Sequence, residues 1–151
     1  MLITPHVCIG VTLGIVFQKP LLIVPLALVS HFLADTVPHW QETMYPYKPT
    51  KWTWIRTYFD GMASLNVVFY ALSLYPTCIK SILLGALVSI VPDIDTIFFQ
   101  FPFVKKMYGV QQYWNWHSWI QRETTSWIGV ATQLFVVATS LSFIFFFSFG
   151  G

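Results

Sequence analysis

The C-terminal part of the chain carries no charged residue. This stretch runs from Trp127 to Gly151 and includes the aromatic run from Phe143 to Phe147. A helix needs about 20 apolar residues to cross the hydrocarbon core of a bilayer, and an uncharged run longer than about 18 is typical of such a helix. The stretch therefore predicts a transmembrane helix, and the rest of the fold has to be compatible with a membrane.

The composition of the whole chain also indicates a membrane environment. Of its 151 residues 56% are hydrophobic and 9% are charged, whereas a soluble domain carries about 25% charged residues. The length corresponds to one domain, so we expect residues 1–151 to form a single membrane-embedded helical domain. The net charge of +2 is too small for a nucleic-acid-binding surface, and no nucleic-acid partner is expected. Cys8 and Cys78 lack CxxC spacing and are expected to be buried thiols.

Proline, glycine and charged residues divide the chain into apolar segments that read as helices. These segments cover roughly residues 6–17, 20–37, 58–75, 78–92 and 124–149. The predicted fold class is all-α, a polytopic membrane bundle of about four to five helices. The first segment is short for a span and is expected to be tilted or re-entrant. The polar connections 40–57 and 96–123 are rich in Trp, Tyr and Lys, which is typical of the lipid headgroup level.

The basic residues indicate an orientation. If each segment crosses once, the two polar connections share one side of the membrane, while Lys19 and Lys80 lie on the other. The first side carries Lys48, Lys51, Arg56, Lys105, Lys106 and Arg122. By the positive-inside rule this side faces the cytoplasm, so we expect an integral membrane protein whose polar face is cytoplasmic.

The same topology places every histidine and all four aspartates at helix ends or in loops on that side. They are His6, His31, Asp35, His39, Asp60, Asp93, Asp95 and His117. His31, Asp35 and His39 are spaced i, i+4, i+8 and would share one helix face, unless Pro38 ends the helix first. Imidazoles and carboxylates together suit Zn, or else Mn or Fe, and so many ligands allow one or two ions. The eight residues are thus predicted metal ligands, with Zn first among the metals.

Simpler interpretations of these residues stay open. The group around His31 can be a hydrogen-bond network at a helix end, in which a carboxylate holds the imidazoles. Asp93 and Asp95 can end a helix and favour a turn. Asp60 can stabilise the N-terminal end of a helix, and His117 lies in an aromatic, amphipathic stretch suited to the membrane interface.

Three motifs carry a resemblance to a known family. They are Thr4-Pro5-His6 with Gly10 and Gly14, the run Ser30-His31-Phe32-Leu33-Ala34-Asp35-Thr36-Val37-Pro38-His39, and Gly85-Ala86 leading to Val91-Pro92-Asp93-Ile94-Asp95. On these motifs the chain resembles a prokaryotic family of small inner-membrane metal-dependent hydrolases, which is distantly similar to zinc-dependent phospholipase C. The resemblance implies phosphoester hydrolysis, with His31 and Asp35 as a His-x-x-x-Asp metal pair. Family members often carry more than one histidine in the last polar connection, where this chain has only His117.

The expected function is that of a membrane-bound metal-dependent hydrolase. It would act on a phospholipid or a lipid-linked phosphoester at the cytoplasmic face, because headgroups already lie at the depth of the site. A metal-activated water would be the nucleophile, with Asp35 in the catalytic metal site and Asp95 as the proton acceptor. The alternative is a non-catalytic structural or partner subunit with a polar or metal-binding cluster. An ion conduit is disfavoured, because between the ends the segments offer only Asn66, Gln133 and hydroxyl side chains.

Overall fold

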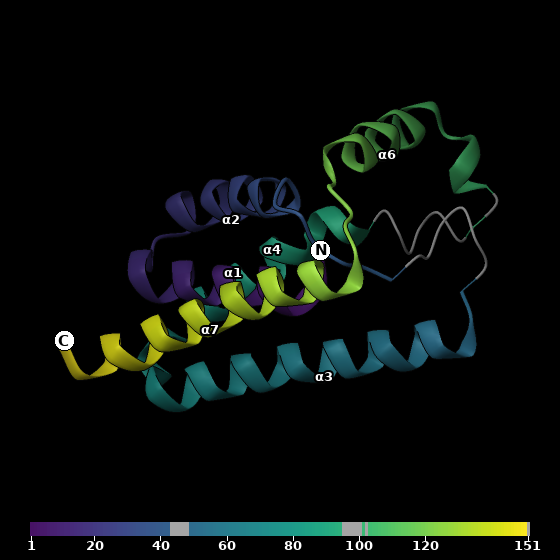
Figure 1. Ribbon diagram of the computed structural model, residues 1–151. Coiled ribbons are helices and arrows are strands. Elements are labelled where there is room, and N and C mark those ends of the chain that lie inside the picture. The colour runs from purple at the N-terminus through teal and green to yellow at the C-terminus, as the bar shows by residue number, and fades with distance from the viewer. Residues whose placement is uncertain (43–48, 95–100, 102, 151) are drawn as a thin grey trace.

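A computed structural model of the chain describes residues 1–42, 49–94, 101 and 103–150, without the side chains of residues 105, 149 and 150. The helices are α1 (Ile3–Phe17), α2 (Pro20–Asp35), α3 (Lys51–Leu74), η1 (Pro76–Cys78), α4 (Ile79–Ile90), η2 (Val91–Asp93), η3 (Val104–Lys106), α6 (Tyr108–Ile120) and α7 (Ser126–Gly150). Apart from one isolated bridge between His39 and Glu123, all regular structure in the described residues is helical. The all-α class is therefore confirmed (Figure 1).

Helix α3 begins earlier than predicted. Thr50 caps it, because the Thr50 hydroxyl accepts from the Thr53 amide at 3.2 Å and the Thr53 hydroxyl accepts from the Thr50 amide at 3.3 Å. This reciprocal pair satisfies two donors that a helix N-terminus otherwise leaves free. The predicted start near residue 58 was wrong, and Asp60 lies inside α3 instead of at its beginning.

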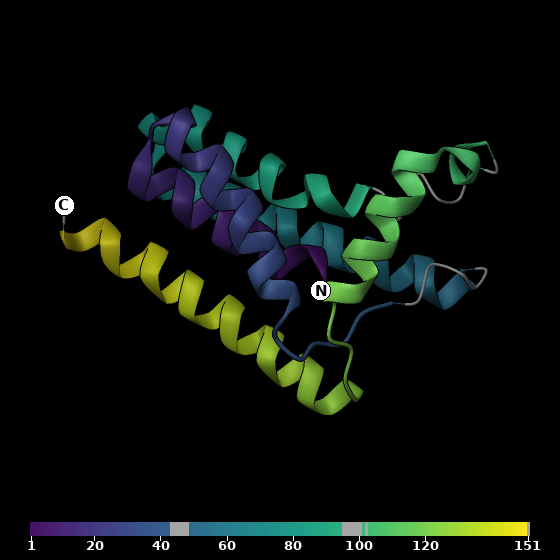
Figure 2. The same ribbon diagram turned by 90° about the horizontal axis from the view of Figure 1, so that it is seen from above.

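The aromatic stretch before Gln121 forms helix α6, which was not among the predicted helices. Its pattern is amphipathic, since His117 is buried while Tyr108 and Trp119 are exposed. A stretch that is poor in charge and rich in aromatic residues resembles an interfacial loop in composition, so only its helical period distinguished it. In Figure 2, α6 extends from the end of the bundle at which the N-terminus lies.

Helix α1 is the central element, with α2, α3, α4 and α7 packed around it. It approaches α4 closely through small residues, because a Cβ added to Gly10 would collide with the Gly85 carbonyl and one added to Gly14 with that of Ser81. Glycines four residues apart allow two helix backbones this proximity, as they often do in membranes. Val11, Ile15, Ile82 and other apolar residues complete the core at this crossing, together with Cys8 and Cys78, which are free and buried as predicted.

Two short turns decide which helix ends meet. Residues 18 and 19 join α1 to α2, with Gln18 in the left-handed region at φ 50°, and η1 joins α3 to α4. Each pair is therefore antiparallel. The beginning of α1, the end of α2, the end of α4 with η2, and the beginning of α7 all lie at the same end of the bundle (Figures 1 and 2).

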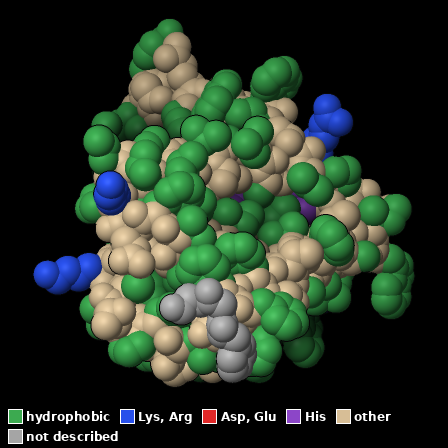
Figure 3. All heavy atoms as spheres, turned by 90° about the vertical axis from the view of Figure 1, so that its left-hand side faces the viewer, with side chains coloured by type: hydrophobic (Ala, Val, Ile, Leu, Met, Phe, Trp, Pro, Cys, Tyr) green, Lys and Arg blue, Asp and Glu red, His purple; other side chains and the backbone are tan. Residues whose placement is uncertain are grey.

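Among the described residues, two helical segments are long and apolar enough to cross a membrane by length and composition, Pro76–Asp93 and Ser126–Ser148. Only 11% of the second is buried inside the protein, which is unlike the core helix of a soluble protein. Helices α1 and α2 are apolar but shorter than 18 residues. Figure 3 views the end at which α7 finishes, where hydrophobic side chains dominate, a few basic side chains lie at the margin and no acidic side chain is in view.

Candidate metal centre

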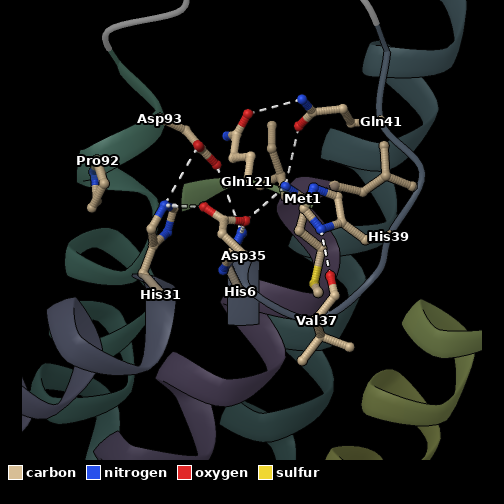
Figure 4. A network of polar contacts seen from close by, with 12 residues as sticks. Met1, His6, His31, Asp35, Val37, His39, Gln41, Pro92, Asp93 and Gln121 are labelled. Carbon is tan, nitrogen blue, oxygen red and sulfur yellow. Dashed lines mark hydrogen bonds and ion pairs between the residues drawn. The ribbon is translucent and has the colours of Figure 1, made fainter. Parts of the chain in front are cut away.

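Four of the predicted ligands form one compact group. His31 and Asp35 come from α2, Asp93 from η2 and His117 from α6. Each offers one nitrogen or oxygen, and these four atoms all lie within 4.8 Å of one another. In Figure 4 the labelled side chains of His31, Asp35 and Asp93 converge from two separate elements. Such a group is able to hold a metal ion.

Asp35 is at the centre of the group. Its Oδ2 lies 3.2 Å from His31 Nε2 and 3.1 Å from His117 Nε2, while its Oδ1 lies 3.3 Å from His6 Nε2. Asp93 Oδ1 is farther out, at 3.5 Å from His31 Nε2 and 3.8 Å from His117 Nε2. The Asp35 side chain is fully buried, whereas that of Asp93 is 20% exposed. The group therefore opens to its surroundings at Asp93.

The orientation of His31 is determined by a neighbouring helix. Its Nδ1 lies 2.7 Å from the Ser89 carbonyl oxygen, and because a carbonyl only accepts, this nitrogen carries the proton. The Nε2 of a neutral His31 then presents a lone pair to the Asp35 and Asp93 carboxylates. A hydrogen bond on the far nitrogen is the arrangement that orients histidine ligands in metal sites. Lone pairs that face carboxylates at this distance require a cation or an added proton between them.

His6 adjoins the group from the first turn of α1. Its ring stacks on the His31 ring with centroids 3.9 Å apart and an interplanar angle of 20°. The His6 Nε2 also lies 3.9 Å from Asp93 Oδ2. Among the described residues neither ring nitrogen makes a hydrogen bond of good geometry, although the side chain is buried. A third imidazole is thus available beside Asp35.

His39 does not stack on α2 as predicted. The helix ends at Asp35, and the chain after Pro38 pairs with the segment before α7, since the His39 amide donates to the Arg122 carbonyl at 3.0 Å. Burial lowers the pKa of the His39 imidazole, and the nearby N-terminal ammonium group lowers it further. The neutral ring donates from Nδ1 to Val37 at 2.8 Å. In Figure 4 it lies on the side of Asp35 away from His31, outside the four-residue group.

Asp60 is also not in this group. Its carboxylate accepts from the Ile3 amide at 2.7 Å and from the Thr4 amide at 3.1 Å, and from the Thr4 hydroxyl at 2.6 Å. A carboxylate at the first turn of a helix satisfies free amides and interacts favourably with the helix dipole. Asp60 therefore caps α1 from α3, which is the simpler interpretation that the sequence left open. Asp95, the predicted proton acceptor, lies outside the described residues.

Several contributors to this end of the bundle were not predicted. The ammonium group of Met1 lies 2.8 Å from Asp35 Oδ1 and 3.3 Å from Gln41 Oε1, and Gln41 Nε2 donates to Gln121 at 2.9 Å. Gln133, which the sequence placed in the middle of its segment, accepts from the Leu2 amide and donates to the Trp40 carbonyl, each at 2.8 Å. The one feature of the sequence that could have indicated these contacts was a glutamine within the otherwise apolar α7.

Comparison of the chain with family models, with curated proteins and with solved structures gave no match. The class of protein is therefore defined by the fold and the site. In the part of the chain that the structure describes, it is an all-helical protein with two potential membrane-spanning segments and a largely buried histidine and aspartate group suited to a metal ion. The resemblance to inner-membrane hydrolases stays a prediction.

Proposed function

We propose that the chain is a membrane-bound metal-dependent hydrolase. The observation that carries the proposal is the group of His31, Asp35, Asp93 and His117, in which one imidazole is oriented by the Ser89 carbonyl. Two carboxylates in one largely buried group are costly unless positive charge compensates them. A divalent cation would offset both negative charges and would bind the imidazole nitrogens and carboxylate oxygens whose lone pairs face each other.

The ligand set favours zinc. Two imidazoles and two carboxylates match the nitrogen and oxygen ligands of catalytic zinc sites, and Mn or Fe(II) accept the same atoms. His6, with its Nε2 3.3 Å from Asp35 Oδ1, would be a further ligand beside Asp35 if a second ion were bound. When bound, such an ion would lower the pKa of a coordinated water and stabilise negative charge on a phosphoryl oxygen.

Other roles in the proposed reaction fall to particular residues of the chain. Asp93 is at the open side of the group, so a substrate would arrive there. His31 and His117 form the buried side and exclude water behind the reacting group. Asp95, which follows Asp93 by two residues, stays the proposed proton acceptor, because a carboxylate is able to take the proton of an activated water.

The proposed substrate is a phospholipid or a lipid-linked phosphoester. Helix α7 exposes most of its apolar surface, and α6 near the site exposes Trp119, a residue typical of the membrane interface. A site at this end of the bundle lies at headgroup depth if α7 spans the bilayer. We place this end at the cytoplasmic face on the distribution of basic residues, six against two.

One observation favours a second candidate, a non-catalytic protein with a polar network. The Met1 ammonium group lies 2.8 Å from Asp35 Oδ1 and supplies one positive charge to the group. A protonated histidine would supply another, which would leave no requirement for a metal. This network would support a structural or partner subunit.

Elemental analysis of the protein purified in mild detergent tests the two candidates. Zinc, manganese and iron are supplied during expression, chelators are avoided, and the wild type is compared with His31→Ala and Asp35→Ala. Glu42→Ala is the matched control, because Glu42 pairs with Arg56 at 2.8 Å away from the group.

The hydrolase proposal expects near-stoichiometric metal in the wild type and in Glu42→Ala, and loss of metal in the other two variants. Release of a phosphorylated headgroup or of diacylglycerol from phospholipid vesicles would then identify the reaction. A wild type without metal under these conditions would overturn the proposal and leave the polar network.

A further inference from the structure

A cavity of about 710 Å³ lies beside the four-residue group. It is bounded by α2, by η2 and by the segment from η3 into α6. Its size falls within the range of about 300 to 1,000 Å³ that ligand pockets occupy. Leu28 and Phe32 line it from α2, and Val110 and Tyr113 line it from α6. The cavity is therefore built by the same elements that position His31, Asp93 and His117.

The lining is hydrophobic. Among the described lining residues, Tyr113 carries the only polar side-chain group, and its hydroxyl donates to the Pro92 carbonyl at 3.1 Å. The described lining residues include no charged side chain. A polar ligand would lose its hydration here without gaining hydrogen bonds, which is unfavourable, whereas hydrocarbon gains by leaving water.

The cavity and the metal group share a wall. The Phe32 ring stands edge-on to His31 at 5.3 Å and to His117 at 5.7 Å between centroids, and the Tyr113 ring lies 5.6 Å from His117. Pro92, another lining residue, directly precedes Asp93. Ile94, which follows Asp93, is also a lining residue, so the apolar lining flanks Asp93, whose side chain is 20% exposed.

The cavity also has a direction. Leu28 precedes Phe32 by four residues on α2, so the lining extends about 6 Å along this helix away from the metal group. That direction leads from the end of α2 toward its middle, and so toward the hydrocarbon core if the bundle is inserted in a bilayer. An occupant would lie with one end at Asp93 and the other at membrane depth.

We propose that this cavity holds one acyl chain of a phospholipid whose phosphoester lies at the metal group. The inference rests on the proposed function, because the metal group defines where the headgroup lies. It narrows the substrate to an amphiphile with a long hydrocarbon chain directly next to the phosphoester. A soluble phosphoester would leave the cavity unused.

Photo-crosslinking tests the occupant independently of metal. The probe is a phosphatidylethanolamine with a diazirine in one acyl chain, incorporated with the purified protein into nanodiscs, and labelled peptides are identified by mass spectrometry. Val110→Trp fills the cavity, and Gly109→Leu fills it with little strain, because a Cβ at Gly109 meets nothing within 4 Å. Gln112→Trp is the matched control on the exposed side of α6.

We expect label on Phe32, Val110 or Tyr113 in the wild type, a reduction of fivefold or more in both filling variants, and no change in Gln112→Trp. Label confined to the exposed surface of α7, or cavity label that neither filling variant reduces, overturns the inference.

Metal content, measured in the same samples, separates this inference from the proposed function. Cavity label in a protein without metal supports the acyl-chain site and overturns the hydrolase. Bound metal without cavity label overturns the acyl-chain site alone.

Discussion

His31 Nδ1 donates to the Ser89 carbonyl at 2.7 Å, which couples the last turns of α2 to the last turn of α4. This contact holds the His31 ring with Nε2 toward Asp35 and Asp93. The carbonyl is available because the last carbonyls of a helix lack partners within it. The same contact brings η2, which carries Asp93, to the end of α2. The metal group thus depends on the packing of α4 as much as on its own residues.

Replacing Asp35 with Asn should remove metal and destabilise the protein. The substitution keeps the shape of the side chain but leaves the Met1 ammonium group and three imidazoles without a buried anion. Removing one partner of a buried ion pair costs about 3 to 5 kcal/mol. Thermal unfolding in detergent, measured beside Glu42→Gln, checks this. Unchanged stability and metal content would show that Asp35 is not the central anion.

Replacing Asp60 with Ala should destabilise the protein without removing metal. The carboxylate caps α1 through the Ile3 and Thr4 amides, and loss of a cap costs about 0.5 to 2 kcal/mol. Unfolding and elemental analysis are compared with those of the wild type. A folded Asp60→Ala variant without metal would show that Asp60 is a metal ligand, as the sequence predicted.

Replacing Gly10 with Ala should lower the stability of the bundle. The added Cβ meets the Gly85 carbonyl, and overpacking of this kind costs about 1 to 3 kcal/mol. Gly61→Ala is the control, because its Cβ meets nothing within 4 Å and Ala is favoured over Gly in a helix by about 0.5 to 1 kcal/mol. A lower melting temperature for Gly10→Ala and an equal or higher one for Gly61→Ala are expected. Equal effects would contradict the close α1–α4 crossing.

Removing metal should increase hydrogen exchange in α6 more than in any other helix. His117 is the member of the four-residue group that belongs to α6, and a ligand that binds only the folded site stabilises it by about 2.7 kcal/mol at a hundred times its dissociation constant. Hydrogen exchange with and without chelator should differ in Tyr108–Ile120 and change little in α1. His117→Ala should show no response to chelator. The same exchange in α6 before and after chelation would argue for the metal-free network.

The sequence by itself determined the helical class, most helix boundaries, the antiparallel hairpins and the end of the bundle at which the polar residues gather. These features depend on local patterns, namely apolar runs, turn residues and the i, i+4 spacing of His31 and Asp35. Such patterns define which face and which end a residue occupies.

Only the tertiary structure decided which of the predicted ligands come together. Asp60 caps α1 because α3 begins at Lys51, and His39 leaves the group because α2 ends at Asp35. His117 joins because α6 packs against α2. Distances between elements depend on how closely α1 and α4 cross and on how the loops after α2 and before α7 pair. These contacts join residues far apart in the sequence, so no local pattern determines them.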